Sequence, residues 1–159
     1  MRDRNLSIFR SECKRFPVIY ALRKRTRERL RETQYYLSKP DQIHSHMFSF
    51  STNDSGHYLN TLAKKYQCED MLKEIDLWMN EIDRIIDGVP AVSMKYFIWV
   101  IWLEQKNYHK IAEKYNENPD WLSRTISKQL QESFRKTGIN VAEMDIFTKL
   151  LNRQIYYDK

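Results

Sequence analysis

Between Val92 and Lys136 the chain reads VSMKYFIWVIWLEQKNYHKIAEKYNENPDWLSRTISKQLQESFRK, and this segment predicts three successive helices. Ser93 is a candidate N-cap for a first helix that is apolar on nearly all sides, so we expect that helix to be buried. Asn107 is a candidate N-cap for a second, short helix. Asn118 followed by Pro119 predicts the start of a third, because asparagine caps helices and proline suits their first position.

The third helix has an apolar face and a polar face. Its apolar residues are spaced by four: Leu122, Ile126, Leu130 and Phe134. Its polar residues are Ser123, Arg124, Ser127, Lys128 and Gln131. A tight turn at 116–117 would join it to the second helix, which predicts a helix-turn-helix that enters the major groove of DNA.

Two sets of contacts with DNA follow from this arrangement. We expect the polar face of the third helix to read base edges, since Arg and Lys donate to guanine and Gln pairs with adenine. We expect contacts with the DNA backbone from Lys106, Lys110, Lys114 and Asn118. The alternative is an ordinary three-helix bundle with a solvated polar face.

The segment IAEKYN at 111–116, with the apolar positions of the third helix after it, resembles without a gap the helix-turn-helix in region four of bacterial sigma factors. The resemblance covers roughly forty residues and implies DNA binding through the third helix. Glu117 departs from it, because that family usually places an apolar residue there. Pro119 and Trp121 are also atypical of the family.

A longer resemblance covers most of the chain. The segment FRSECKRFP at 9–17 precedes a charged helix, a polar loop, a long helix ending in IDRII at 82–86, and the sigma-like motif. This layout resembles the RinA and ArpU type of phage late-gene regulators from Gram-positive hosts. The resemblance implies a phage or prophage transcriptional activator of packaging, structural and lysis genes, which acts on double-stranded DNA in the host cytoplasm. The alternative is a helical module that binds host RNA polymerase or another host protein without reading DNA.

The first 31 residues are strongly basic, with eleven Arg or Lys against three acids. A helix after Phe16 and Pro17 that extends to about Leu37 is predicted by its apolar spacing. Its other side carries four arginines that could contact DNA phosphates: Arg23, Arg25, Arg27 and Arg29. A solvated face and a phosphate-binding face are both consistent with this pattern.

The segment 38–56 is rich in polar residues and predicts a loop. His44 and His46 have a spacing seen in metal ligands, but only His57 and Asp54 are near them in sequence. We therefore expect neither a metal nor a cofactor.

From about Tyr58 to Asp87 the spacing of apolar residues predicts a long amphipathic helix that ends at Gly88. Its apolar residues alternate between steps of three and four: Leu72, Ile75, Met79, Ile82 and Ile86. This spacing is usual for a core-facing helix and also describes a coiled-coil seam, so a homodimer is a second hypothesis. Residues 69–87 hold seven acids against two bases, and this acidic helix either packs on the basic helix or serves another partner such as polymerase.

After Gly138, the segment Asn140–Glu143 has the form of a capping box and predicts a last helix. Its apolar face either covers the bundle or forms a dimer contact. The predicted organisation is therefore 1–56 for the basic helix and loop, 57–91 for the long helix, 92–137 for the helix-turn-helix, and 138–159 for the last helix.

Composition supports an all-α, helical-bundle fold of about one domain. The chain has 159 residues, a net charge of +6 and a pI near 9.3, with 3 Gly and 4 Pro. Cys13 and Cys68 show no metal-binding spacing, which favours a reducing cytoplasm, and neither a secretory signal nor a membrane span is expected. We expect no enzyme activity, since phosphate-loop, nucleophile-elbow and zinc-protease motifs are missing. Three acids, Glu74, Glu81 and Asp83, could hold Mg²⁺, but a solvated helix face explains them better.

Overall fold

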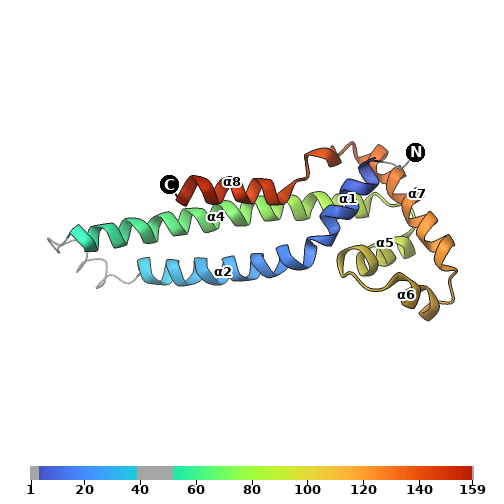
Figure 1. The fold of residues 1–159 in the computed structure, drawn as a ribbon, viewed down its shortest axis with the longest axis horizontal. Helices are drawn as coiled ribbons and strands as arrows, with labels where there is room; N and C mark the ends of the chain where they lie inside the picture. Colours follow the sequence, from blue (N-terminus) through green and yellow to red (C-terminus); the bar gives the residue numbers. More distant parts are fainter. Residues whose placement is uncertain (1–3, 39–51, 159) are drawn as a thin grey trace. The chain divides into compact units, whose positions relative to one another are not determined.

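The computed structural model describes residues 4–38 and 52–158, and every regular element in those ranges is a helix (Figure 1). The predicted all-α class is therefore confirmed for this part of the chain. The elements are α1 (Arg4–Lys14), α2 (Phe16–Ser38), α4 (Thr52–Asp87), α5 (Val92–Ile98), the π-helix η1 (Trp99–Leu103), α6 (Tyr108–Lys114), α7 (Pro119–Thr137), the 3-10 helix η2 (Val141–Glu143) and α8 (Ile146–Asp158). None of the helices in these two ranges is long and apolar enough to cross a membrane.

The contacts divide the chain into two compact units. Unit 1 consists of Met1–Tyr20 and Leu77–Ile146, and unit 2 consists of Ala21–Asp76 and Phe147–Lys159. This division differs from the boundaries predicted from the sequence, because α1 joins the segment around α7 rather than the basic helix that follows it.

Within unit 2, α2 and α4 run antiparallel. The Nε of Arg23 lies 2.9 Å from the Oδ1 of Asp76, and the ring centroids of Tyr36 and His57 are 5.5 Å apart. Later residues of α2 thus meet earlier residues of α4. The basic helix therefore contacts the acidic segment at Asp76, as expected from one of the two alternatives that the charge pattern left open.

The boundaries of α2 agree with the predicted helix, whereas α4 begins earlier than predicted. It starts at Thr52 instead of about residue 58, so the predicted loop is wrong for 52–56. Thr, Asn, Asp and Ser are favoured in the first turn of a helix as well as in loops, which explains the error. Residues 39–51, which include His44 and His46, lie outside the described residues.

The core of unit 1 lies under α7. The four apolar residues of α7 predicted from their spacing are all buried: Leu122, Ile126, Leu130 and Phe134. On α5 and η1, Phe97 and Leu103 are buried, but Tyr96 is 47% exposed, so the predicted burial on all sides is wrong for this helix. It covers the core with one side and faces solvent with the other.

Helix α5 also begins earlier than predicted, before the expected N-cap Ser93. Its N-cap is Ala91, with no side-chain capping bond, and Ser93 lies inside the first turn. The backbone N–H of Ala91 donates to Oε1 of Gln129, 3.0 Å away on α7. This tertiary contact fixes the start of the helix, and a local capping signal could not reveal it.

Helix α1 was not predicted. It places Phe9 in the core with 0% exposure, edge-on to Phe134 at 5.6 Å and 5.9 Å from the ring of Trp102. A short, charged helix has little intrinsic stability, so packing against α7 and η1 must hold it.

Gly88 ends α4 as predicted, but not through a left-handed conformation. Its N–H bonds to the carbonyl of Arg84 at 3.0 Å, and the one described glycine with positive φ is Gly138. A Cβ at Gly88 would lie 2.5 Å from the Oγ of Ser133 and 3.0 Å from a methyl carbon of Thr137. Glycine is required here because α7 passes close to the end of α4.

Gly88→Ala should therefore lower the free energy of unfolding by about 1–3 kcal/mol, the usual cost of overpacking. Ser133 is fully buried and its hydroxyl donates to the carbonyl of Ile85, so it cannot easily move aside. Urea unfolding followed by circular dichroism measures the change. If the midpoint of urea unfolding did not change, α4 and α7 would not approach each other this closely.

A buried carboxylate joins α1 to the end of α4 within unit 1. Glu12 is 4% exposed and accepts hydrogen bonds from Trp78 Nε1 at 3.0 Å and from Arg15 at 3.3 Å. Burial raises the pKa of Glu12 above its ordinary value, and the charge of Asp145 raises it further. The bond from Trp78, the charge of Arg15 and a backbone bond from Ile146 lower this pKa.

The raised pKa gives a prediction for pH. A carboxyl group whose pKa is higher in the folded state stabilises the fold below its unfolded pKa, and this contribution is lost as the pH rises through the folded pKa. Glu12→Gln removes this titrating group. The free energy of unfolding of the variant, relative to that of the unmodified chain, should therefore increase from about pH 4 to about pH 7. Urea unfolding of both proteins at the two pH values tests this. A constant difference, or one of opposite sign, would contradict it.

Candidate nucleic-acid interface

Helix α6 starts with the predicted cap. The side-chain oxygen of Asn107 accepts hydrogen bonds from the backbone N–H groups of His109 at 2.9 Å and Lys110 at 3.3 Å. Ala112 is fully buried on the inner face of α6, where its small side chain permits close packing against α7.

The turn between α6 and α7 forms at the predicted residues. Asn116 adopts the left-handed conformation with φ of 55°, which asparagine tolerates better than most residues. The N–H of Glu117 bonds to the carbonyl of Ala112 at 2.8 Å, and the N–H of Asn116 to that of Glu113 at 3.2 Å. This pair of bonds is a Schellman motif, in which the residue after the left-handed one often makes an apolar contact. Glu117 occupies that position and is half-buried.

Helix α7 also starts as predicted, with Asn118 as N-cap and Pro119 in the first turn. The oxygen of the Asn118 side chain accepts from the backbone N–H groups of Asp120 at 2.9 Å and Trp121 at 3.2 Å. Capping occupies this oxygen, so the amide nitrogen of Asn118 is the group that could donate to a DNA phosphate.

Three of the five predicted base-reading residues lie on the outward face of α7. Arg124, Lys128 and Gln131 are exposed, and Arg135 follows on the same face but was missed in the sequence. Its seven-residue spacing from Lys128 was the available signal. The Nε of Arg124 donates to the carbonyl of Asp120 at 3.3 Å. Within 4–38 and 52–158, none of the three cations on this face forms an ion pair with an acid.

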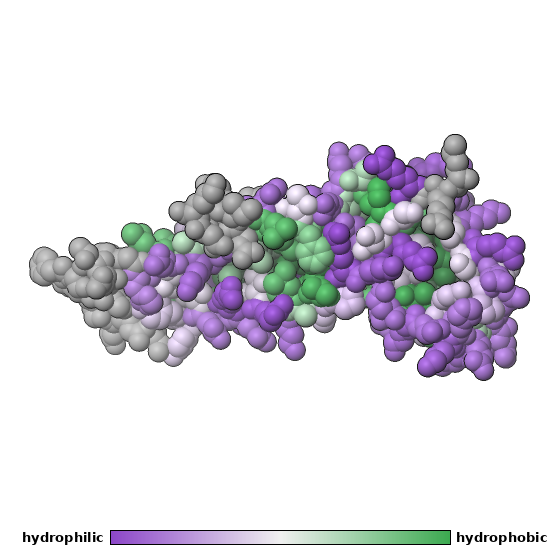
Figure 2. Space-filling view, in the orientation of Figure 1, coloured by the Kyte–Doolittle hydropathy of each residue, from purple (hydrophilic) through white to green (hydrophobic). Residues whose placement is uncertain are grey.

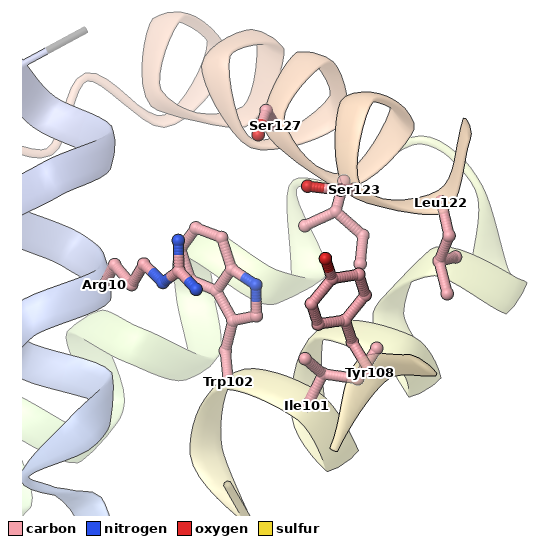
Figure 3. A pocket seen from close by; sticks show the side chains of 8 residues that line it. Arg10, Ile101, Trp102, Tyr108, Leu122, Ser123 and Ser127 are labelled. Carbon is pink, nitrogen blue, oxygen red and sulfur yellow. The ribbon is translucent and has the colours of Figure 1, made fainter. Parts of the chain in front are cut away.

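Ser123 and Ser127 lie instead on one flank of α7. They border a cavity of about 130 Å³ whose rim also contains Arg10 from α1, Trp102 and Tyr108 (Figure 3). No signal in the sequence links the N-terminal segment with this flank.

The outward face also includes a tryptophan. Trp121 is 44% exposed and borders an open depression on α7. The depression is lined by Trp121, Arg124, Thr125, Lys128, Gln129 and Glu132. Trp121 was noted in the sequence only as atypical of the sigma-like motif.

The lysines predicted to contact the DNA backbone are all exposed. Lys106 lies in the loop before α6, and Lys110 and Lys114 lie on α6, with the Nζ of Lys114 5.5 Å from the ring centroid of Tyr115. In Figure 2 the visible surface of this part of unit 1 is mainly hydrophilic.

The arginines of α2 belong to unit 2, whereas α6 and α7 belong to unit 1. Arg23 is engaged by Asp76, while Arg25, Arg27 and Arg29 are exposed. They are therefore available to a partner, but the structure does not group them with α7.

Among the side chains that the structure describes, no three His, Cys, Asp or Glu residues are placed to hold a metal ion. Cys13 and Cys68 are both free and buried, and burial raises the pKa of each thiol. Of the acids considered for Mg²⁺, Glu74 and Glu81 are half-buried and Asp83 is exposed.

Comparisons of the chain with models of protein families, with curated protein sequences and with solved structures gave no match.

Proposed function

We propose that this chain is a DNA-binding transcriptional regulator in which α6 and α7 form a helix-turn-helix of the sigma-region-four kind. The observation that carries the proposal is the outward face of α7, where Arg124, Lys128 and Arg135 are exposed without acidic partners among the described residues. A capped helix with such a face, joined by a tight turn to a short helix, suits insertion into the major groove.

The charge around the motif supports an anionic partner. Residues 106–137 hold seven Lys or Arg against four acids. Exposed cations that no acid neutralises gain free energy when they replace the counterions of DNA phosphates. The expected division of roles is base reading by Arg124, Lys128 and Gln131, and backbone contact by the lysines before and on α6.

The biological role in this proposal comes from the resemblance to RinA and ArpU-type regulators. It is the activation of late phage or prophage genes in the host cytoplasm, through double-stranded DNA and contact with host RNA polymerase. The acidic segment 69–87 is a candidate for the polymerase contact, although Asp76 within it is paired with Arg23. Glu74→Lys with Glu81→Lys should reduce activation of a reporter gene and leave DNA binding intact.

Binding to duplex DNA measured by fluorescence anisotropy at increasing KCl concentration tests the proposal. If the surface neutralises four to six DNA phosphates, a plot of the logarithm of the association constant against the logarithm of the salt concentration should have a slope of about −4 to −5. Binding that does not change with salt, or no binding at low salt, would contradict DNA recognition by this surface.

The second candidate function is that of a protein-binding module. Trp121 favours this function, because it is exposed beside the depression on α7 and tryptophan is enriched at the hot spots of protein interfaces. Trp121→Ala separates the two functions. Loss of polymerase binding with unchanged DNA affinity would support the protein-binding function for this part of α7. Loss of DNA affinity alone would assign Trp121 to the DNA interface.

A further inference from the structure

The cavity beside α7 is lined by apolar side chains and by several hydrogen-bond donors. Its aliphatic lining residues are Ile101, Leu122 and Ile126. The hydroxyls of Ser123 and Ser127 face the same hollow as the guanidinium of Arg10 and the hydroxyl of Tyr108 (Figure 3). Its volume of about 130 Å³ exceeds the space that a single water takes, about 30 Å³.

The side chain of Arg10 is held beside the cavity by an aromatic ring and not by an acid. The Cζ of its guanidinium lies 5.7 Å from the ring centroid of Trp102, a cation–π contact. No carboxylate lines the cavity, and none pairs with Arg10 in the part of the chain that the structure describes. A cation and several hydroxyl donors around one hollow favour an anion with several acceptor oxygens.

The position of the cavity on α7 indicates which anion this is. A major groove about 12 Å wide is nearly filled by a helix that measures about 10–12 Å with its side chains, so the flanks of the helix meet the phosphate walls. Ser123 and Ser127 each precede a residue of the outward face by one position, which is about 100° around the helix. When Arg124 and Lys128 face the bases, this flank faces the DNA backbone.

We propose that this cavity binds one phosphate of the DNA backbone, with Arg10 supplying the charge and Ser123, Ser127 and Tyr108 donating hydrogen bonds. The inference rests on the proposed function and refines it. It assigns backbone contact to Ser123 and Ser127, which the sequence predicted to read bases, and it makes α1 part of the DNA-binding surface.

The test compares Arg10→Ala with Arg4→Ala, which removes the same charge from α1 at an exposed position outside the cavity. Anisotropy titrations use a duplex selected for tight binding and a random duplex. Arg10→Ala should weaken binding to both duplexes about tenfold and make the salt slope shallower by about 0.9. Arg4→Ala should change the affinity by less than about twofold. Ser127→Ala removes a donor without changing charge and should weaken binding about threefold.

A scan with methylphosphonate linkages, which neutralise one phosphate at a time, locates the contact. A methylphosphonate at one position of the DNA should weaken binding of the unmodified chain about tenfold. The same linkage should leave binding of Arg10→Ala unchanged, because this variant already lacks the arginine that contacts that phosphate. If Arg10→Ala unfolds the chain, as circular dichroism would show, the same scan with Ser127→Ala decides.

Two results overturn the inference and are distinguishable from each other. If Arg10→Ala matches Arg4→Ala and no linkage shows this dependence, the cavity binds no phosphate, while sequence-specific binding by the unmodified chain leaves the proposed function standing. If the unmodified chain binds neither duplex, the proposed function and the inference are both wrong.

Discussion

Arg124→Ala combined with Lys128→Ala should lower the affinity for a selected DNA site by at least about 100-fold, because each good contact with a base contributes about 1–3 kcal/mol of discrimination. Both side chains are exposed on the outward face of α7 and point away from its buried residues, so the fold should be unaffected. Affinity for a random duplex should fall much less, by about tenfold, since base reading adds nothing there. Anisotropy titrations with both duplexes measure the two losses.

The matched control for this pair is Arg84→Ala with Lys73→Ala. It removes the same two charges from exposed positions on α4. If the control lowers affinity as much as the α7 pair, the effect reflects net charge and α7 is not the reading helix. Equal losses for selected and random DNA would show that Arg124 and Lys128 contact phosphates instead of bases.

Phe9→Ala should lower the free energy of unfolding by about 3–5 kcal/mol, the usual loss for a fully buried phenylalanine. Its ring contacts Phe134 on α7 and Trp102 on η1, so its removal leaves a void between three helices of unit 1. Urea unfolding monitored by tryptophan fluorescence measures the change.

Val92→Ala is the control for this truncation, because Val92 is 78% exposed and its loss should alter stability by less than about 0.5 kcal/mol. If Phe9→Ala had an equally small effect, α1 would not be part of the core. In that case Arg10 would not be held beside α7 either.

The parts of the fold that the sequence predicted correctly depend on local chemistry. Asn107 and Asn118 cap helices through bonds to residues two and three positions later, and Asn116 bends the turn through its own backbone conformation. The buried face of α7 follows from a four-residue spacing of apolar side chains. Such signals are complete within a few neighbouring residues.

The parts that the sequence did not predict depend on contacts between distant residues. Helix α1 forms where Phe9 meets Phe134, and the start of α5 is set by a bond from Ala91 to Gln129. The predicted capping box at Asn140 opens only η2, and α8 begins later, at Ile146. Propensity and periodicity carry little information on such tertiary contacts.

The candidate site divides in the same way. The exposed positions of Arg124, Lys128 and Gln131 follow from helical geometry and were predicted. The grouping of Arg10 with Ser127 depends on how α1 packs within unit 1, and no motif in the sequence announces it.

Selection from a pool of random DNA duplexes tests whether α7 reads DNA sequence. The chain is incubated with the pool, bound duplexes are amplified over several rounds, and the products are sequenced. We expect enrichment of one discrete sequence motif, and methylation of guanine N7 in the major groove of that motif should abolish binding. If the folded chain enriches no motif, α7 does not read DNA sequence.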